Sequence, residues 1–174
     1  MRFRQTTSLP GLYLNVNRIG DSGACALAEM LSENQNLLEL GLASNGIGPC
    51  GVALANALKT HQGLRSLELG FSRSTRALHC QGNCLGDEGA IALADALKQN
   101  RTLMHLDLSR NGMTASGLAA LIAALQENQT LQSLRIDGPG QDVLADILQR
   151  NREQNPGQSW KSSDISLIKS VYRT

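Results

Sequence analysis

Residues 103–130 read LMHLDLSRNGMTASGLAALIAALQENQT, and they decide the fold because their pattern recurs along the chain. Residues 9–36 (LPGLYLNVNRIGDSGACALAEMLSENQN) and residues 37–63 (LLELGLASNGIGPCGVALANALKTHQG) have the same spacing. Each stretch reads leucine, two variable residues, leucine, one variable residue, leucine, two variable residues and asparagine, and then becomes rich in apolar residues. Self-similarity with a period of roughly 20 to 50 residues predicts a repeat architecture.

Five leucines begin the repeat units, and the steps between them are 28, 27, 39 and 28 residues. These leucines are Leu9, Leu37, Leu64, Leu103 and Leu131. The third step is too long because an insertion at about residues 71–82 separates the strand pattern from its asparagine, Asn83. We therefore expect about five units, one of which is interrupted.

Leucines that alternate with variable residues predict a short, half-buried strand in each unit. The residues expected to point inward are Leu12 and Leu14, Leu40 and Leu42, Leu67 and Leu69, Leu106 and Leu108, and Leu134 with Ile136. Where the chain turns away from the strand, an asparagine amide can satisfy backbone groups that the turn leaves unpaired. We expect this structural role for Asn17, Asn45, Asn83 and Asn111.

The second half of each unit predicts a helix, as in GAIALADALKQN, where Ile91, Leu93 and Leu97 suit packing against the sheet. Residues of the N-cap type stand near the expected helix starts: Asp21, Asp87 and Thr114. A strand, a crossover helix and a parallel strand connect in the right-handed sense almost without exception. The sequence thus predicts an α/β fold, a right-handed β-α superhelix with a parallel sheet on its concave side and helices outside.

Both ends of such a stack need a cover for their apolar surface. We expect the solenoid to span residues 1–155 and a tail to span residues 156–174. The tail places Ile165, Ile168 and Tyr172 on one helical face, which predicts a capping helix or a helix for a partner groove. The amino end has a thin cover, so the first repeat could self-associate, or the chain could be a piece of a longer protein.

Composition excludes several functional classes. The formal net charge is +1 and 41% of residues are hydrophobic, which predicts one globular unit without the field that attracts nucleic acid. The first ten residues lack a signal-peptide core, and no apolar run approaches the roughly 18 residues that span a bilayer. We expect a cytoplasmic protein that binds neither nucleic acid nor membranes.

The four cysteines, Cys25, Cys50, Cys80 and Cys84, are expected to be reduced thiols, because the chain carries no secretory signal. His79, Cys80 and Cys84 offer three zinc ligands in one loop, but a fourth ligand is missing and adjacent His79 and Cys80 would strain to reach one ion. We therefore expect no metal site, with free thiols or a labile disulfide as the alternatives.

Catalytic signatures are missing from the chain. GxSxG, GxxxxGK and HExxH do not occur. His105 and Asp107 lie two apart on one strand face, where an acid–base pair is conceivable, but an open sheet offers no enclosed pocket. We expect a non-enzyme without a cofactor.

The recurring leucines and asparagines resemble the leucine-rich repeats of ribonuclease inhibitor and of NOD-like immune receptors, from about Leu9 to Arg150. The resemblance implies a recognition module that binds another protein; a related branch, whose members activate small GTPases, supplies the alternative function. The chain departs from the family in its small number of units, its interrupted third unit and the asparagine-free turn DGPGQ of its fifth.

Strand positions that alternate with the buried leucines face solvent on the concave side. They form a central row of an aromatic anchor, an acidic middle and a basic end, which suits a charged partner, although a merely solvated face would also be polar. The partner-binding residues expected on this face are Tyr13, Glu39, Glu68, His105, Asp107 and Arg135.

The insertion, within GFSRSTRALHCQGNC, is the second candidate surface, because loops of this length in a compact repeat are usually functional or disordered. It is basic and contains no acidic residue. We expect Phe71, Arg73 and Arg76 to contact a partner. Of the remaining aromatic residues, Phe3, Trp160 and Tyr172 are expected to serve packing.

Overall fold

The computed structural model describes residues 10–71, 82–138 and 141–158, along which strand and helix alternate five times. The strands are β1 (Gly11–Tyr13), β2 (Glu39–Gly41), β3 (Ser66–Glu68), β4 (His105–Asp107) and β5 (Ser133–Arg135). The helices are α1 (Gly20–Glu33), α2 (Gly51–Thr60), α3 (Gly86–Gln99), α4 (Ala115–Glu127) and α5 (Gln141–Gln154), followed by the short 3-10 helix η1 (Pro156–Gln158).

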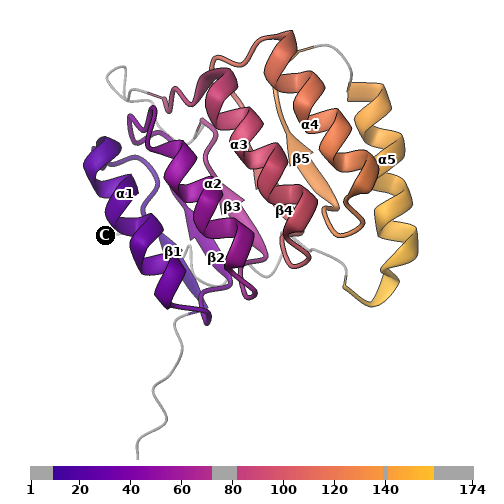
Figure 1. The fold of residues 1–174 in the computed structure, drawn as a ribbon, viewed down its shortest axis with the longest axis horizontal. Coiled ribbons are helices and arrows are strands. Elements are labelled where there is room, and N and C mark those ends of the chain that lie inside the picture. The colour runs from indigo at the N-terminus through magenta and orange to yellow at the C-terminus, as the bar shows by residue number, and fades with distance from the viewer. Residues whose placement is uncertain (1–9, 72–81, 139–140, 159–174) are drawn as a thin grey trace, which may run out of the picture.

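The strands form one parallel sheet in the order β1-β2-β3-β4-β5, so sequence neighbours are also spatial neighbours. The register aligns equivalent residues of successive units, such as Leu12 with Leu40 and Leu40 with Leu67. Helices α1 to α5 lie side by side over one face of this sheet (Figure 1). This arrangement confirms the α/β solenoid with its sheet on the inner side and its helices outside.

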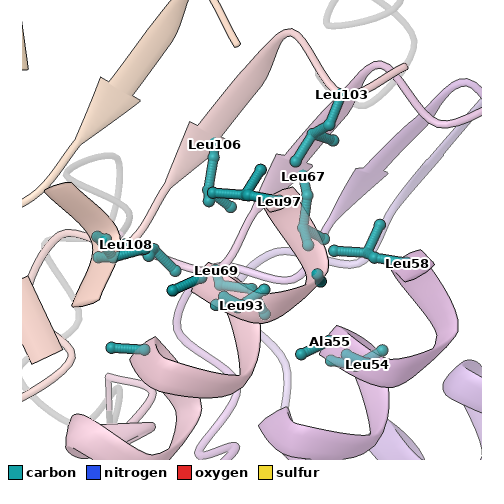
Figure 2. Packing of buried hydrophobic residues seen from close by; sticks show 14 of the residues in the cluster. Leu54, Ala55, Leu58, Leu67, Leu69, Leu93, Leu97, Leu103, Leu106 and Leu108 are labelled. Atoms are coloured by element: carbon teal, nitrogen blue, oxygen red, sulfur yellow. The ribbon is translucent and has the colours of Figure 1, made fainter. Parts of the chain in front are cut away.

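Leucines from the strands and the helices share one core between the two layers. Figure 2 shows Leu67 and Leu69 of the third strand segment opposite Leu93 and Leu97 of α3. The predicted inward leucines of the middle units are at most 1% exposed. Leu12 and Leu134 are only partly buried, because each belongs to an end strand that has a neighbour on one side only.

One helix position was predicted wrongly. Ile91 is 42% exposed, whereas Ala90, Leu93, Ala94 and Leu97 are buried. Those four residues follow the spacing of a single helical stripe, and Ile91 lies one residue off it. Small alanines on the stripe let α3 approach its neighbours closely.

The asparagines that follow the strands form a ladder, which confirms their structural role. The Oδ1 atom of Asn83 accepts hydrogen bonds from the backbone N–H groups of Asn45 and Ile47, both at 3.0 Å. Its Nδ2 atom donates to the carbonyls of Leu42 (2.9 Å) and Leu69 (2.7 Å). The ladder therefore joins each unit to the one before it through otherwise unpaired backbone groups.

A second ladder, which sequence reasoning missed, runs along the turns from helix to strand. Asn100 accepts from the N–H groups of Thr102 and Leu103 and donates to the carbonyls of Leu58 and His61. Asn34, His61, Asn128 and Asn151 occupy related places in the other units. The in-phase recurrence of Asn34, Asn100 and Asn128 was the signal that could have revealed it.

His61 substitutes for asparagine in this second ladder. Its Nδ1 atom accepts from the N–H groups of Gly63 (3.1 Å) and Leu64 (2.9 Å), and the ring is fully buried. Burial lowers the pKa of His61, against the opposing effect of a hydrogen bond with the backbone of Asn34. The folded protein therefore holds this imidazole neutral, because protonation would remove the Nδ1 acceptor.

We expect a His61→Asn variant to lose less stability than the wild type in mild acid. Below the ordinary histidine pKa of 6.5, the unfolded chain binds a proton at residue 61 more readily than the folded protein does. As the pH falls below that value, the wild type should lose up to about 1.4 kcal/mol of unfolding free energy per pH unit through this group. The loss ends when the pH reaches the folded-state pKa of His61. Urea unfolding of both proteins between about pH 5 and pH 8 measures the difference. His105 is common to both proteins, so parallel pH curves would contradict the role given to His61.

Two of the three predicted N-caps act on a neighbouring helix instead of their own. Thr114 caps α4 as expected, accepting from the N–H of Ser116. Asp87 lies inside the first turn of α3, and its carboxylate accepts from the N–H groups of Thr114 (2.8 Å) and Gly117 (3.0 Å). The hydrogen bond from the Thr114 hydroxyl has the largest effect on Asp87, and together with these backbone bonds it lowers the pKa of the carboxyl. Asp21 similarly accepts from the N–H groups at the start of α2, so both aspartates tie successive helices together.

The expectation of reduced thiols is contradicted at one pair. Cys25 of α1 and Cys50, which precedes α2, form a disulfide with a Cα–Cα distance of 5.8 Å. The stacking of units explains the pairing, because residues about one repeat apart come side by side. Cys84 is an exposed free thiol.

Candidate functional site

The strand register brings the predicted contact residues into two parallel rows on the face opposite the helices. The central row, defined by the register pairs, consists of Tyr13, Gly41, Glu68, Asp107 and Arg135. The flanking row consists of Gly11, Glu39, Ser66, His105 and Ser133. Side chains from every described unit thus meet on one surface, although they are distant in the sequence.

Side chains at the β1 end lie flat across glycines of the sheet. The Tyr13 hydroxyl donates to a carboxylate oxygen of Glu39. A Cβ atom at Gly11 would lie 2.8 Å from the Tyr13 ring, so the ring rests over that glycine. Asn15 covers Gly41 in the same way and donates from Nδ2 to Glu68 at 3.0 Å. The two glutamates are half-buried and held in fixed positions.

The β4–β5 end contains an ion pair. Arg135 donates to Oδ2 of Asp107 at 3.0 Å, while Oδ1 of Asp107 accepts from the N–H and the hydroxyl of Ser109. Asp107 is 6% exposed, the most covered of the described contact candidates, whereas the Arg135 side chain is 52% exposed. Asp107 therefore positions Arg135, and the net charge of the two rows comes from Glu39 and Glu68.

His105 lies half-buried in the flanking row. Burial lowers the pKa of His105; Glu68 and Asp107 oppose this effect, and Arg135 adds to it. The imidazole is therefore neutral at neutral pH. It contributes a polar, uncharged surface between the acidic and basic ends of the face.

Phe71 connects the strand face to the start of the insertion. Its N–H donates to the hydroxyl of Ser109 at 3.3 Å, and its ring faces the Arg110 guanidinium, 4.8 Å from the ring centroid. Arg110 was not among the predicted contact residues; its signal was a basic residue in the turn just before Asn111. Arg73 and Arg76 lie outside the described residues, so their predicted role stays a prediction.

Within residues 10–71, 82–138 and 141–158, no three His, Cys, Asp or Glu side chains lie close enough together to hold a metal ion. His79 and Cys80, which the sequence placed in one loop with Cys84, lie outside these ranges. In the same part of the chain, no helix has the length and apolar character needed to cross a bilayer.

Parallel strands with inward leucines, an asparagine ladder and an outer layer of helices define a leucine-rich repeat solenoid. A family model described as Leucine Rich repeat matches residues 33–54, 76–94 and 99–121. The NACHT, LRR and PYD domains-containing protein 3 of Bos taurus is 37% identical over 111 residues, which cover 62% of this chain and 10% of that protein. The ribonuclease inhibitor of Sus scrofa is 32% identical over 135 residues, covering 60% of this chain and 27% of the inhibitor.

Solved structures share the fold at low sequence identity. Leiomodin-1 actin-binding site 2 superimposes with a TM-score of 0.73 at 18% identity, over 95% of this chain and 91% of that one. The tropomodulin C-terminal domain of Caenorhabditis elegans gives 0.68 at 16% identity, over 88% and 90%. The chain is thus a leucine-rich repeat protein with repeats of the ribonuclease-inhibitor and NOD-like-receptor type, and it spans only a small part of the length of those sequence relatives.

Proposed function

We propose that this protein is a protein-interaction module that binds a basic surface of a partner through its concave strand face. The observation that carries the proposal is the in-register row of Tyr13, Glu68 and Arg135, with Glu39 beside it. A half-buried tyrosine and fixed carboxylates suit an interface, because little conformational freedom is lost on binding. The leiomodin-1 segment of the same fold is named an actin-binding site, which supports a protein as the kind of partner for such a scaffold.

Charge removal on this face should weaken binding. We expect a Glu39→Gln/Glu68→Gln variant to capture about tenfold less partner than the wild type, because two fixed carboxylates are lost while the side-chain shapes are kept. Tagged protein would capture partners from cell lysate, mass spectrometry would identify them, and calorimetry would measure the purified pair at two salt concentrations. A Glu29→Gln/Glu88→Gln variant, with both changes on exposed helix positions, is the matched control.

Equal loss of partner capture in both variants would indicate a nonspecific charge effect. No loss in either variant would contradict the strand face as the interface.

The insertion with Arg73 and Arg76 is the alternative surface. Activation of a small GTPase is the alternative activity, tested by the rate of GTP hydrolysis with the same variants. Self-association through the first repeat and a cytoplasmic location stay predictions.

A further inference from the structure

A pocket of about 420 Å³ lies between β5 and α5 at the end of the described solenoid. Leu134 and Ile136 from the β5 segment and Leu144 and Leu148 from α5 form its apolar floor. Leu106, which pairs in register with Leu134, is fully buried, whereas Leu134 is only partly buried. Leu134 is therefore the part of the floor that a following unit covers elsewhere in the stack, while Ile136, Leu144 and Leu148 are at most 8% exposed.

Positive charge surrounds this floor. Three of the lining residues are arginines, Arg110, Arg135 and Arg152, and the single acidic lining residue is Asp137. The Asp137 carboxylate accepts the backbone N–H of Arg110, which leaves the Arg110 guanidinium against the ring of Phe71. The pocket thus combines an aliphatic base with a basic rim.

Neutral groups hold two of these arginines in place. Arg152 donates to the backbone carbonyl of Gln132 at 2.9 Å and to the side chain of Gln149 at 3.4 Å. Arg110 stacks on Phe71, while Arg135 pairs with Asp107. Positioned guanidinium groups that stack or bond to neutral partners keep their charge available to a carboxylate.

We propose that this pocket binds an acidic peptide segment of a partner protein that carries a bulky aliphatic side chain. The aliphatic group covers the leucine floor, and flanking carboxylates meet Arg110 and Arg152. A nucleic-acid strand offers the negative charge but no aliphatic group for the floor. Residues 159–174 of the chain contain Lys161, Lys169 and Arg173 against Asp164, so their side chains carry net charge of the same sign as the arginines of the rim.

A fluorescein-labelled peptide, Glu-Glu-Leu-Leu-Glu-Glu, tests the proposal by fluorescence anisotropy with the full chain. We expect an Arg110→Gln/Arg152→Gln variant to bind it at least about tenfold more weakly. An Ala145→Trp variant should have a similar effect, because Ala145 is an exposed lining residue and the indole fills the pocket without removing a core side chain. Arg65→Gln, an exposed arginine outside the pocket lining, should change affinity less than about twofold. Thermal melts by circular dichroism confirm that each variant is folded.

Two further peptides test the basic rim and the apolar floor of the pocket one at a time. Replacing the glutamates by glutamine, or the leucines by serine, should each weaken binding to the wild type at least about tenfold. The proposal is overturned if Arg65→Gln weakens binding as much as Arg110→Gln/Arg152→Gln does, or if a labelled oligothymidine binds more tightly than the peptide through the same arginines. It is also overturned if the peptide binds only to an Ile165→Ser/Ile168→Ser variant, because the chain's own tail would then be the occupant. None of these outcomes depends on Glu39 or Glu68, so the concave-face proposal stands or fails separately.

Discussion

An Asn83→Ala variant should lose about 3 to 5 kcal/mol of unfolding free energy. Asn83 is 4% exposed, and its side chain makes four hydrogen bonds to backbone groups of two repeat units, its own and the one before it. Alanine leaves these two N–H and two carbonyl groups unpaired in the interior, and each unsatisfied buried group costs about 1 to 3 kcal/mol before relaxation and water entry. Urea unfolding followed by circular dichroism measures the loss.

Asn17→Ala is the matched control for this prediction. Asn17 occupies the same position in the first unit, but it is exposed, and its Nδ2 atom bonds only to carbonyls of its own turn. Water can replace those bonds, so we expect a loss below about 1 kcal/mol. Equal losses at Asn17 and Asn83 would show that the asparagine acts through local turn propensity and not through bonds between units.

The repeat itself could be predicted because each unit contains its own local signals. Leu67 and Leu69 alternate with residues of the opposite sheet face, and Asn83 follows them at the turn even across the insertion. Such a pattern has one structural solution, since only the stacking of parallel strands buries every leucine. The strand register could be predicted from the same repeat spacing, and it places Tyr13, Glu68 and Arg135 in one row as expected.

Contacts between units were harder to predict because sequence rules for helix ends are local. Asp87 has the residue type of an N-cap for its own helix, yet its carboxylate reaches the next helix, 27 residues further along the chain. Ile91 has the hydrophobicity of a core residue, but the narrow stripe between close helices selects alanine and leucine at other positions. These outcomes depend on the distance between neighbouring units, which no single unit encodes.

The row in which each strand residue lies was predicted, but the pairing and burial of the side chains were not. Strand alternation predicts only which way a residue points, so it did not indicate that Asp107 would be covered and paired with Arg135. The contact between Arg110 and Phe71 was missed because the insertion lies between these two residues in the sequence. Side-chain pairing across strands requires the three-dimensional arrangement.

A Cys25→Ser variant should lose about 3 kcal/mol of unfolding free energy in oxidising buffer and almost none in the presence of excess thiol. The Cys25–Cys50 bond closes a loop with a sequence separation of 25 residues, and restricting such a loop in the unfolded chain is worth about 3 kcal/mol. Urea unfolding of wild type and variant, with and without dithiothreitol, measures the difference. Cys84→Ser removes an exposed free thiol and should change stability by less than about 0.5 kcal/mol in either buffer.

The same variants connect the disulfide to the location of the protein. Cytoplasmic reductants keep most thiols reduced, so a protein that acts there has to fold without this bond. Wild type in dithiothreitol is then the relevant state, and we expect it to remain folded because the buried leucines and the hydrogen bonds of both ladders do not include the Cys25–Cys50 bond. Unfolding of the reduced wild type at 37 °C would contradict the cytoplasmic prediction and favour an oxidising compartment. Alkylation of thiols at the moment of cell lysis, followed by peptide mapping, would show directly which state the cell maintains.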